Sequence, residues 1–185
     1  MFSLKQKNEE NKVTYQKPGI YDNVVITDII LGKSSWKGSP FIQMNTKNEN
    51  GDVGRSSKMY LNTVPSEGKE KSAWDVTSKN IIELVVATNN IPYKEAEEIQ
   101  LVTTQSESQD AQYEDLVKNL KNLLLNKSFR GKFKGEQTKE NGLIYSSLDK
   151  AESMNVPKLT SSLRFDETKD IKLFQPVTET TVDFS

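Results

Sequence analysis

The sequence predicts a mainly β domain, a small five-stranded barrel with a helical insertion between its third and fourth strands. Three β-rich stretches joined by turn signals precede residue 62, and two more follow residue 127. Between them, apolar residues recur at spacings of three and four, which is the period of an amphipathic helix. The 185 residues suffice for one domain with appendages.

The first three strands form a predicted meander. A turn at Pro18-Gly19 precedes Ile20 to Leu31, a long run rich in β-branched residues. A Gly/Ser-rich loop leads to a second strand from Phe41 to Thr46. Asn50-Gly51 is a strong hairpin signal, after which Val53 to Leu61 returns as the third strand.

Helical periodicity covers the middle of the chain, and β character then resumes. Helices are predicted over residues 73–88 and 110–126, with a short acidic helix within 93–101. Residues 128–134 alternate strictly between a Phe/Gly face and a basic face, and a fifth strand is predicted over 143–148. On the first face, Phe129 and Phe133 are expected to fill the barrel.

These elements divide the chain into three parts. Residues 1–17 are predicted to be a polar arm, and 18–150 a barrel domain with an insertion at about 72–126. Residues 151–185 are predicted to be a strap or tail held by isolated apolar anchors such as Leu163 and Phe174.

The composition argues against most catalytic chemistry. There is no cysteine and no histidine, which excludes Ser-His-Asp and Cys-His triads and the ordinary zinc sites. Scattered carboxylates and Ser/Lys pairs show no catalytic spacing, so we expect no enzyme, no cofactor and no metal. No apolar run approaches a membrane span, so a soluble cytoplasmic protein is expected, without a membrane partner.

The order of three strands, a helical segment and two strands is the layout of the OB-fold, a Greek-key barrel. An α+β domain with the same element order is the alternative.

Short stretches also resemble phage-encoded single-stranded-DNA-binding proteins. They are residues 18–24, Gly32-Lys33-Ser34, residues 38–42, and the passage from a helix into a basic-aromatic strand over 124–134. This resemblance implies an OB-fold and sequence-tolerant binding of intermediates in DNA replication or recombination, in the host cytoplasm. It also implies an acidic C-terminal tip that recruits partner proteins. Residues 179–185 hold only two acids, which puts this recruitment in doubt.

Binding single strands requires cations for phosphates and aromatic faces for bases. The candidates are Lys33, Trp36, Lys37, Phe41, Lys47, Arg55, Lys58, Tyr60, Arg130, Lys132 and Lys134. Acidic residues gather instead in the helical segment, so a chain of net charge −1 has a predicted positive face and a predicted negative face.

Each candidate has a structural alternative. Trp36 lies in a polar loop, where stacking on bases and a packing role remain equally open. Phe41, like Phe129 and Phe133, favours a place inside the barrel. The basic residues of 128–134 suit either phosphate contact or an ordinary solvated strand face.

Two functions follow from these observations. The first is single-stranded DNA binding that weakens steeply with salt. The second is a non-catalytic structural or assembly role, in which the arm and the strap reach onto neighbouring molecules. The oligomeric state does not follow from the sequence.

Overall fold

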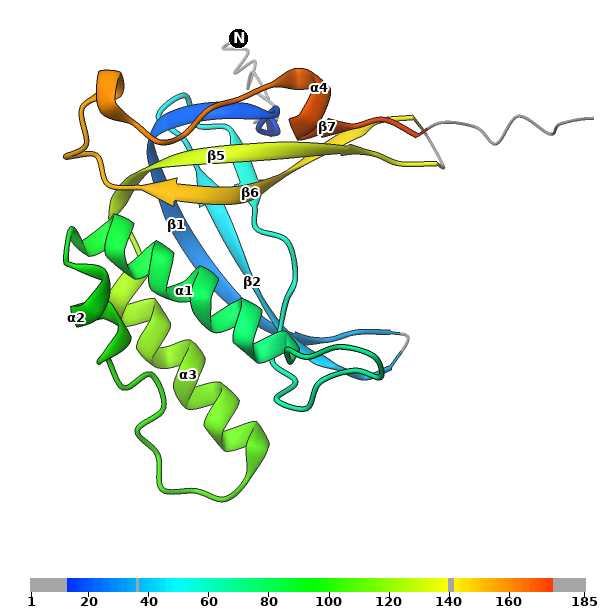
Figure 1. Ribbon diagram of the computed structural model, residues 1–185, viewed down its shortest axis with the longest axis vertical. Helices are drawn as coiled ribbons and strands as arrows, with labels where there is room; N and C mark the ends of the chain where they lie inside the picture. Colours follow the sequence, from blue (N-terminus) through cyan, green and yellow to red (C-terminus); the bar gives the residue numbers. More distant parts are fainter. Residues whose placement is uncertain (1–12, 36, 140–141, 175–185) are drawn as a thin grey trace, which may run out of the picture.

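The computed structural model describes residues 13–35, 37–139 and 142–174. It is a mixed α/β fold built on a mostly antiparallel sheet (Figure 1). The strands are β1 (Gly19–Lys33), β2 (Pro40–Lys47), β3 (Val53–Arg55), β4 (Met59–Tyr60), β5 (Ser128–Gln137), β6 (Ile144–Glu152) and β7 (Ile171–Lys172). The helices are α1 (Ala73–Asn89), α2 (Tyr93–Glu97), α3 (Gln109–Leu124) and α4 (Glu167–Asp170), with a 3-10 turn at Lys158–Thr160.

The main path of the sheet runs β3-β2-β1-β5-β6. The first half of β1 pairs with β5, its second half pairs with β2, and β4 also pairs with β2. The described residues do not form a closed ladder, which differs from the predicted barrel. The two ends of the strand order, β3 and β6, approach each other at one parallel bridge between Ser56 and Leu148.

The predicted third strand is broken in two by Ser56. Its hydroxyl accepts the Met44 backbone N–H at 3.0 Å, while its own N–H donates to the Met44 carbonyl at 2.8 Å. The Ser56 hydroxyl thus accepts a hydrogen bond that a backbone carbonyl would accept in a regular ladder, and the strand is interrupted between β3 and β4.

The helices follow β4 and precede β5, as the sequence predicts. Helix α1 begins at a capping box, in which Ser72 and Asp75 satisfy each other's backbone N–H groups, and it ends at the left-handed Asn90. Helices α1 and α3 pack against the inner face of the sheet.

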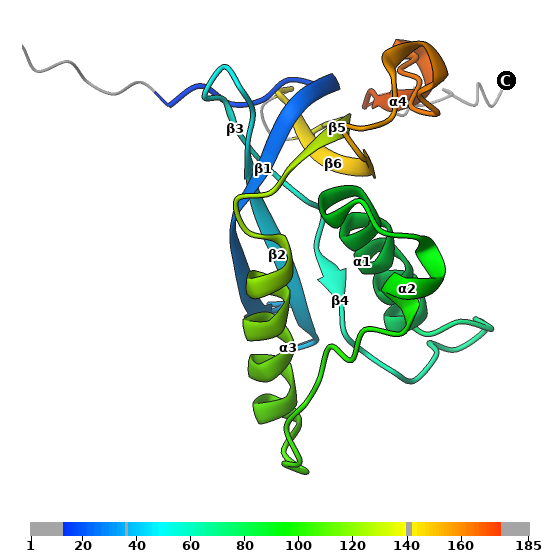
Figure 2. The same cartoon turned by 90° about the vertical axis from the view of Figure 1, so that its left-hand side faces the viewer.

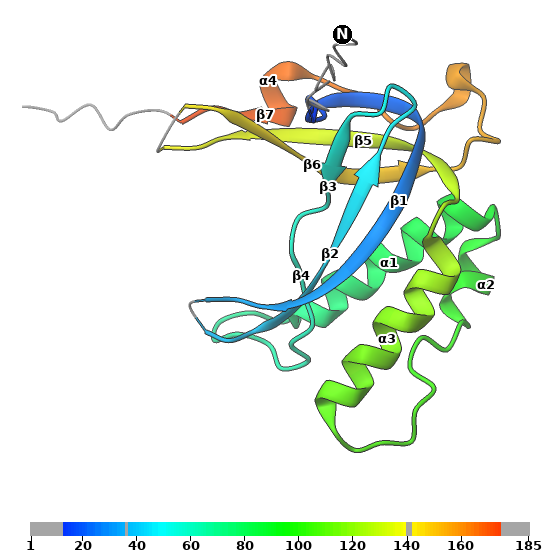
Figure 3. The same ribbon diagram turned by 180° about the vertical axis from the view of Figure 1, so that it is seen from behind.

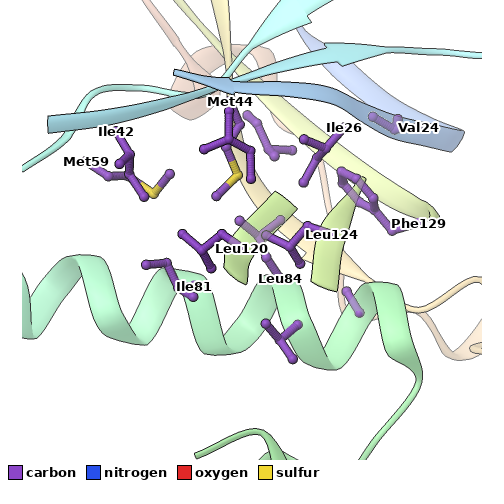
Figure 4. Packing of buried hydrophobic residues seen from close by; sticks show 14 of the residues in the cluster. Val24, Ile26, Ile42, Met44, Met59, Ile81, Leu84, Leu120, Leu124 and Phe129 are labelled. Carbon is purple, nitrogen blue, oxygen red and sulfur yellow. The ribbon is translucent and has the colours of Figure 1, made fainter. Parts of the chain in front are cut away.

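The core lies between these helices and the strands (Figure 4). It includes Val24, Ile26, Ile42, Met44, Met59, Ile81, Leu84, Leu120, Leu124 and Phe129. Phe129 and Phe133 are completely buried, which confirms their predicted place inside the fold. Each such side chain contributes about 1.5–3 kcal/mol of apolar burial.

Two segments outside the predicted barrel join the sheet. Part of the predicted arm pairs in parallel with β3, where the Gln16 N–H donates to the Val53 carbonyl and the Val53 N–H to the Thr14 carbonyl. After β6 the strap contacts Arg130 and Lys132 of β5 through Val156 and Asp170, and then adds β7 in parallel beside β5. Figures 1 and 2 place α4 of this strap at the opposite end of the molecule from the α3 tip.

Candidate nucleic-acid interface

The outer face of the sheet is defined by the alternation of β2. Ile42, Met44 and Thr46 are buried on the inner side, so Phe41, Gln43, Asn45 and Lys47 belong to the outer side. The register places Gly32 beside Phe41 on β1, and places Tyr60 and Arg55 beside Phe41 and Asn45 on the following strands. Figure 3 looks onto β1 and β2 from this side, with α1 behind them.

An aromatic pair with a cation above it occupies one end of this face. Phe41 and Tyr60 meet edge to face, with ring centroids 5.9 Å apart, and Lys58 Nζ lies 4.6 Å from the centre of the Phe41 ring. Phe41 is buried, but on the outer side of the sheet, so the prediction that it lies in the interior is wrong. Tyr60 is only partly buried and presents the more accessible ring.

The far edge of the Phe41 ring approaches β1 closely because Gly32 has no side chain. A Cβ atom built at Gly32 would stand 2.6 Å from the Phe41 ring, well inside contact distance. The glycine of the predicted basic loop thus makes room for an aromatic residue.

Exposed cations lie beside this pair and farther along the same strands. Lys47, Arg55 and Lys58 are solvent-exposed on or beside the outer face. Lys33 ends β1 and pairs at 3.5 Å with Asp110 of α3, where both side chains are mostly in water and the pair is weak. Lys37 is exposed in the adjoining loop, and Trp36 of that loop lies outside the described residues.

Asp28 is the acid of β1 nearest this surface, and its charge is matched. Lys121 of α3 approaches it at 2.8 Å, and this hydrogen bond, with a second from the Ile29 backbone, holds the pKa of Asp28 below its usual value.

The three predicted cations of β5 lie elsewhere. Arg130 and Lys132 are largely buried beneath the strap, whereas the side chain of Lys134 is 45% exposed. Arg130 Nε binds Asp22 of β1 at 2.6 Å, and its Nη1 binds Glu152 of β6 and the Val156 carbonyl, both at 3.0 Å. Lys134 pairs with Asp149 at 3.0 Å.

The strap itself supplies the partner of Lys132. Asp170 of α4 lies 2.8 Å from Lys132 Nζ, and the two side chains are 6% and 12% exposed. Lys158 of the strap also pairs with Asp22, at 2.5 Å. Arg130 is therefore not the surface cation that the strand alternation suggested, since its side chain is only 5% exposed.

The pKa values in this cluster follow from these contacts. Hydrogen bonds from Lys158 and Arg130 lower the pKa of Asp22, and the hydrogen bond from Lys132 lowers that of Asp170. Burial raises the pKa of Glu152, but hydrogen bonds from Ser161, Ser162 and Arg130 outweigh it and leave that pKa lowered. All three carboxyl groups are held in the charged form.

The contacts that attach the strap differ from the apolar anchors that the sequence predicts. Leu163 is buried, as an anchor should be, but Leu159 and Leu173 are exposed. Ion pairs and the short β7 ladder provide the remaining attachment. The one sequence signal for this attachment is the set of acids that stand among the strap's apolar residues, such as Asp170. Residues 179–185, with the expected recruitment tip, lie outside the described residues.

The described part of the chain contains neither a metal-binding cluster nor a membrane-spanning helix. No group of three or more acidic residues there is arranged to hold a metal ion. None of the described helices is long and apolar enough to cross a bilayer. Comparisons with protein-family models and with curated protein sequences give no match.

Proposed function

We propose that this protein binds single-stranded DNA, without strong sequence preference, on the outer face of β2, β3 and β4 and on the loop between β1 and β2. The DNA would lie across the Phe41–Tyr60 pair, with Lys58, Lys47 and Arg55 contacting phosphates. Lys33, Lys37 and Trp36 would extend this surface into the loop.

The strand connectivity supports an OB-fold as the basis of this function. In this protein β1 pairs with β2 and with β5, and β5 pairs with β6, so β5 and β6 correspond to the fourth and fifth strands of an OB-fold. The end of β3 approaches β6 in parallel at Ser56 and Leu148, where a small Greek-key barrel of this kind would close. OB-folds bind oligonucleotides on the face of strands two and three and on the loops beside it.

The aromatic pair beneath Lys58 is the observation that carries the proposal. Stacking on an aromatic ring contributes about 1–3 kcal/mol per base and tolerates any base. Tyr60 is partly exposed, its ring meets that of Phe41 edge to face, and the exposed Lys58 lies over the Phe41 ring. A base that stacks on Tyr60 would bring its phosphate toward Lys58.

The DNA-contacting set is narrower than the one predicted from the sequence. We leave Arg130 out, because it is buried and bound to two carboxylates. We also leave out Lys132 and Lys134, because they pair with Asp170 and Asp149.

Fluorescence anisotropy of a labelled oligo-dT of about 30 nucleotides tests the proposal, because OB-folds occupy about 4–16 nucleotides each. We expect binding that weakens steeply with salt, and that weakens further by about tenfold in Tyr60→Ala and by a smaller factor in Lys58→Ala. Lys79→Ala is the matched control, since it removes one exposed charge from α1 on the other side of the sheet.

An equal loss in Lys79→Ala would show that net charge matters and not this surface. Absence of binding at low salt would contradict the proposal and favour a structural or assembly role. Thermal unfolding of each variant controls for loss of fold.

A further inference from the structure

An acid lies within the row of polar side chains that crosses the proposed DNA-binding face. Ile29 of β1 is buried on the inner side, so Asp28 belongs to the outer side. The register places Asp28 opposite Asn45 of β2, and Asn45 opposite Arg55 of β3. Along β2, Asn45 follows Phe41 of the aromatic pair by four residues, which is about 13 Å. A negative charge needs a reason here, because the surrounding surface is proposed to bind phosphates.

One carboxylate oxygen of Asp28 is held by the protein, and the other is available. Oδ1 accepts hydrogen bonds from Lys121 Nζ and from the Ile29 backbone N–H, both at 2.8 Å. These bonds orient the carboxylate and lower its pKa, so it is charged at neutral pH. We find no hydrogen bond to Oδ2 from the described residues, and the Asp28 side chain is 47% exposed.

The neighbours of Asp28 differ on its two sides. Ile26, two residues earlier, pairs with β2 along one edge of β1 and bridges to Leu125, at the end of α3, along the other. Lys121 of α3 therefore approaches Asp28 from the edge away from β2, whereas Asn45 stands on the β2 side. The Asn45 side chain is partly exposed, and its amide can both donate and accept hydrogen bonds.

A carboxylate accepts hydrogen bonds and donates none, so it recognises a feature that all four bases share when they are unpaired. Each base carries at least one N–H group on its Watson–Crick edge, which a single strand can present to a protein. In a duplex, base pairing occupies these groups. A duplex instead presents its phosphates to the face of a sheet, and a carboxylate repels them.

We propose that Asp28 and Asn45 form a base-edge site that selects single-stranded over duplex DNA. Asp28 Oδ2 accepts an N–H from the Watson–Crick edge of an unpaired base, and the Asn45 amide binds a neighbouring group on the same edge. The phosphates pass to either side, towards Lys121 and Arg55. Because every base supplies such an N–H, the selection is compatible with sequence-tolerant binding. This inference rests on the proposed function and adds to it the groups that exclude a duplex.

The ratio of single-strand to duplex affinity tests the site. Anisotropy at low salt compares a labelled strand of mixed sequence with the same strand in a duplex. Asp28→Asn keeps an oxygen for the Ile29 N–H but places an NH₂ group where Oδ2 stood. We expect the ratio to fall about three- to tenfold, because the duplex is no longer repelled and the base loses its acceptor. Asn45→Ala should weaken single-strand binding by about two- to fivefold and leave duplex binding unchanged.

Glu97→Gln is the matched control, since it removes one exposed negative charge from α2, among the helices. An equal fall of the ratio in Glu97→Gln would show an effect of net charge and would overturn the site. An unchanged ratio in Asp28→Asn, with single strands still bound, overturns this inference alone. No binding of single strands by the wild type overturns the proposed function as well. If thermal unfolding shows that Asp28→Asn does not fold, Asp28→Ser removes the same charge and keeps an oxygen for the Ile29 N–H.

A modified oligonucleotide tests the hydrogen bond itself. In an oligomer of N3-methylthymine, a methyl group replaces the Watson–Crick N–H of every base. The wild type should bind this oligomer about three- to tenfold less tightly than oligo-dT, and the difference should shrink in Asp28→Asn, which lacks the acceptor. An equal loss in both proteins would mean that the methyl group acts through its bulk, and would overturn the contact between Asp28 and the base.

Discussion

Three buried polar atoms gather around Gly54 without hydrogen-bond partners. They are the Thr46 hydroxyl and both side-chain amide atoms of Gln16. Gly54 leaves the space they occupy, since a Cβ atom there would stand 2.8 Å from the Thr46 oxygen and 3.1 Å from Gln16 Oε1. Leaving a buried polar group unpaired costs about 1–3 kcal/mol.

Thr46→Val should therefore raise the free energy of unfolding by about 1 kcal/mol. The substitution keeps the shape of the side chain and removes the unpaired hydroxyl. Urea unfolding at neutral pH measures the change. A destabilised Thr46→Val would instead mean that the hydroxyl is hydrogen-bonded in solution.

Arg130→Met should lower the free energy of unfolding by about 3 kcal/mol, because it removes the buried cation that two largely buried carboxylates share. Lys169→Met is the comparison, since the Lys169–Asp166 pair is exposed and should contribute under about 0.5 kcal/mol. Equal effects of the two substitutions in urea unfolding would contradict the structural role of Arg130.

Arg130 also marks a limit of prediction from the sequence. The alternation over 128–134 correctly separated the inner phenylalanines from the outer cations. It could not show that the outer side is covered, because Asp22 and Glu152, the partners of Arg130, are distant in the chain. The prediction that Phe41 lies inside the barrel was wrong for a related reason. Its burial on the outer side depends on Gly32 and Tyr60, which lie on other strands.

The contact between β1 and β2 at Gly32 depends on a missing side chain. Gly32→Ala should push the Phe41 ring away and lower the free energy of unfolding by about 1–3 kcal/mol, as overpacking does. It should also weaken oligo-dT binding, because Tyr60 would lose its supporting ring. Unchanged binding with lowered stability would separate the two roles and argue against Phe41 as a support.

Most elements could be predicted from local patterns. The long β1, the hairpin after β2, the helices α1 and α3 and the order around the insertion all follow from periodicity and turn residues. The break between β3 and β4 did not follow, since it results from the bond of Ser56 to Met44 across the sheet. The pairing of residues 14–16 with β3 likewise comes from tertiary contact.

The paired carboxylates make the stability of the whole molecule depend on pH. The pKa values of Asp22, Glu152 and Asp170 are all lowered in the folded state. Unfolded carboxyl groups titrate near pH 4, so in acid the unfolded chain binds more protons than the folded one. Their contribution is complete above about pH 4–5 and is lost as the pH falls through the folded values.

Urea unfolding between pH 7 and pH 3 should show this loss. Asp22→Asn should be less stable than the wild type at pH 7, and the difference should shrink as the pH falls below about 4. Parallel curves for the two proteins would mean that Asp22 does not contribute to the acid sensitivity.

The pairing of β1 with β5 joins strands on opposite sides of the helical insertion. During synthesis, β1, β2 and all of α1 to α3 emerge before the first residue of β5. The edge of β1 that pairs with β5 therefore has no partner until the chain has grown past Ser128. Such distant pairings are slow to form because the intervening loop must close first. The nascent protein thus passes through a stage with an open apolar strand, and chaperones or rapid completion of the chain would protect it from aggregation at that stage.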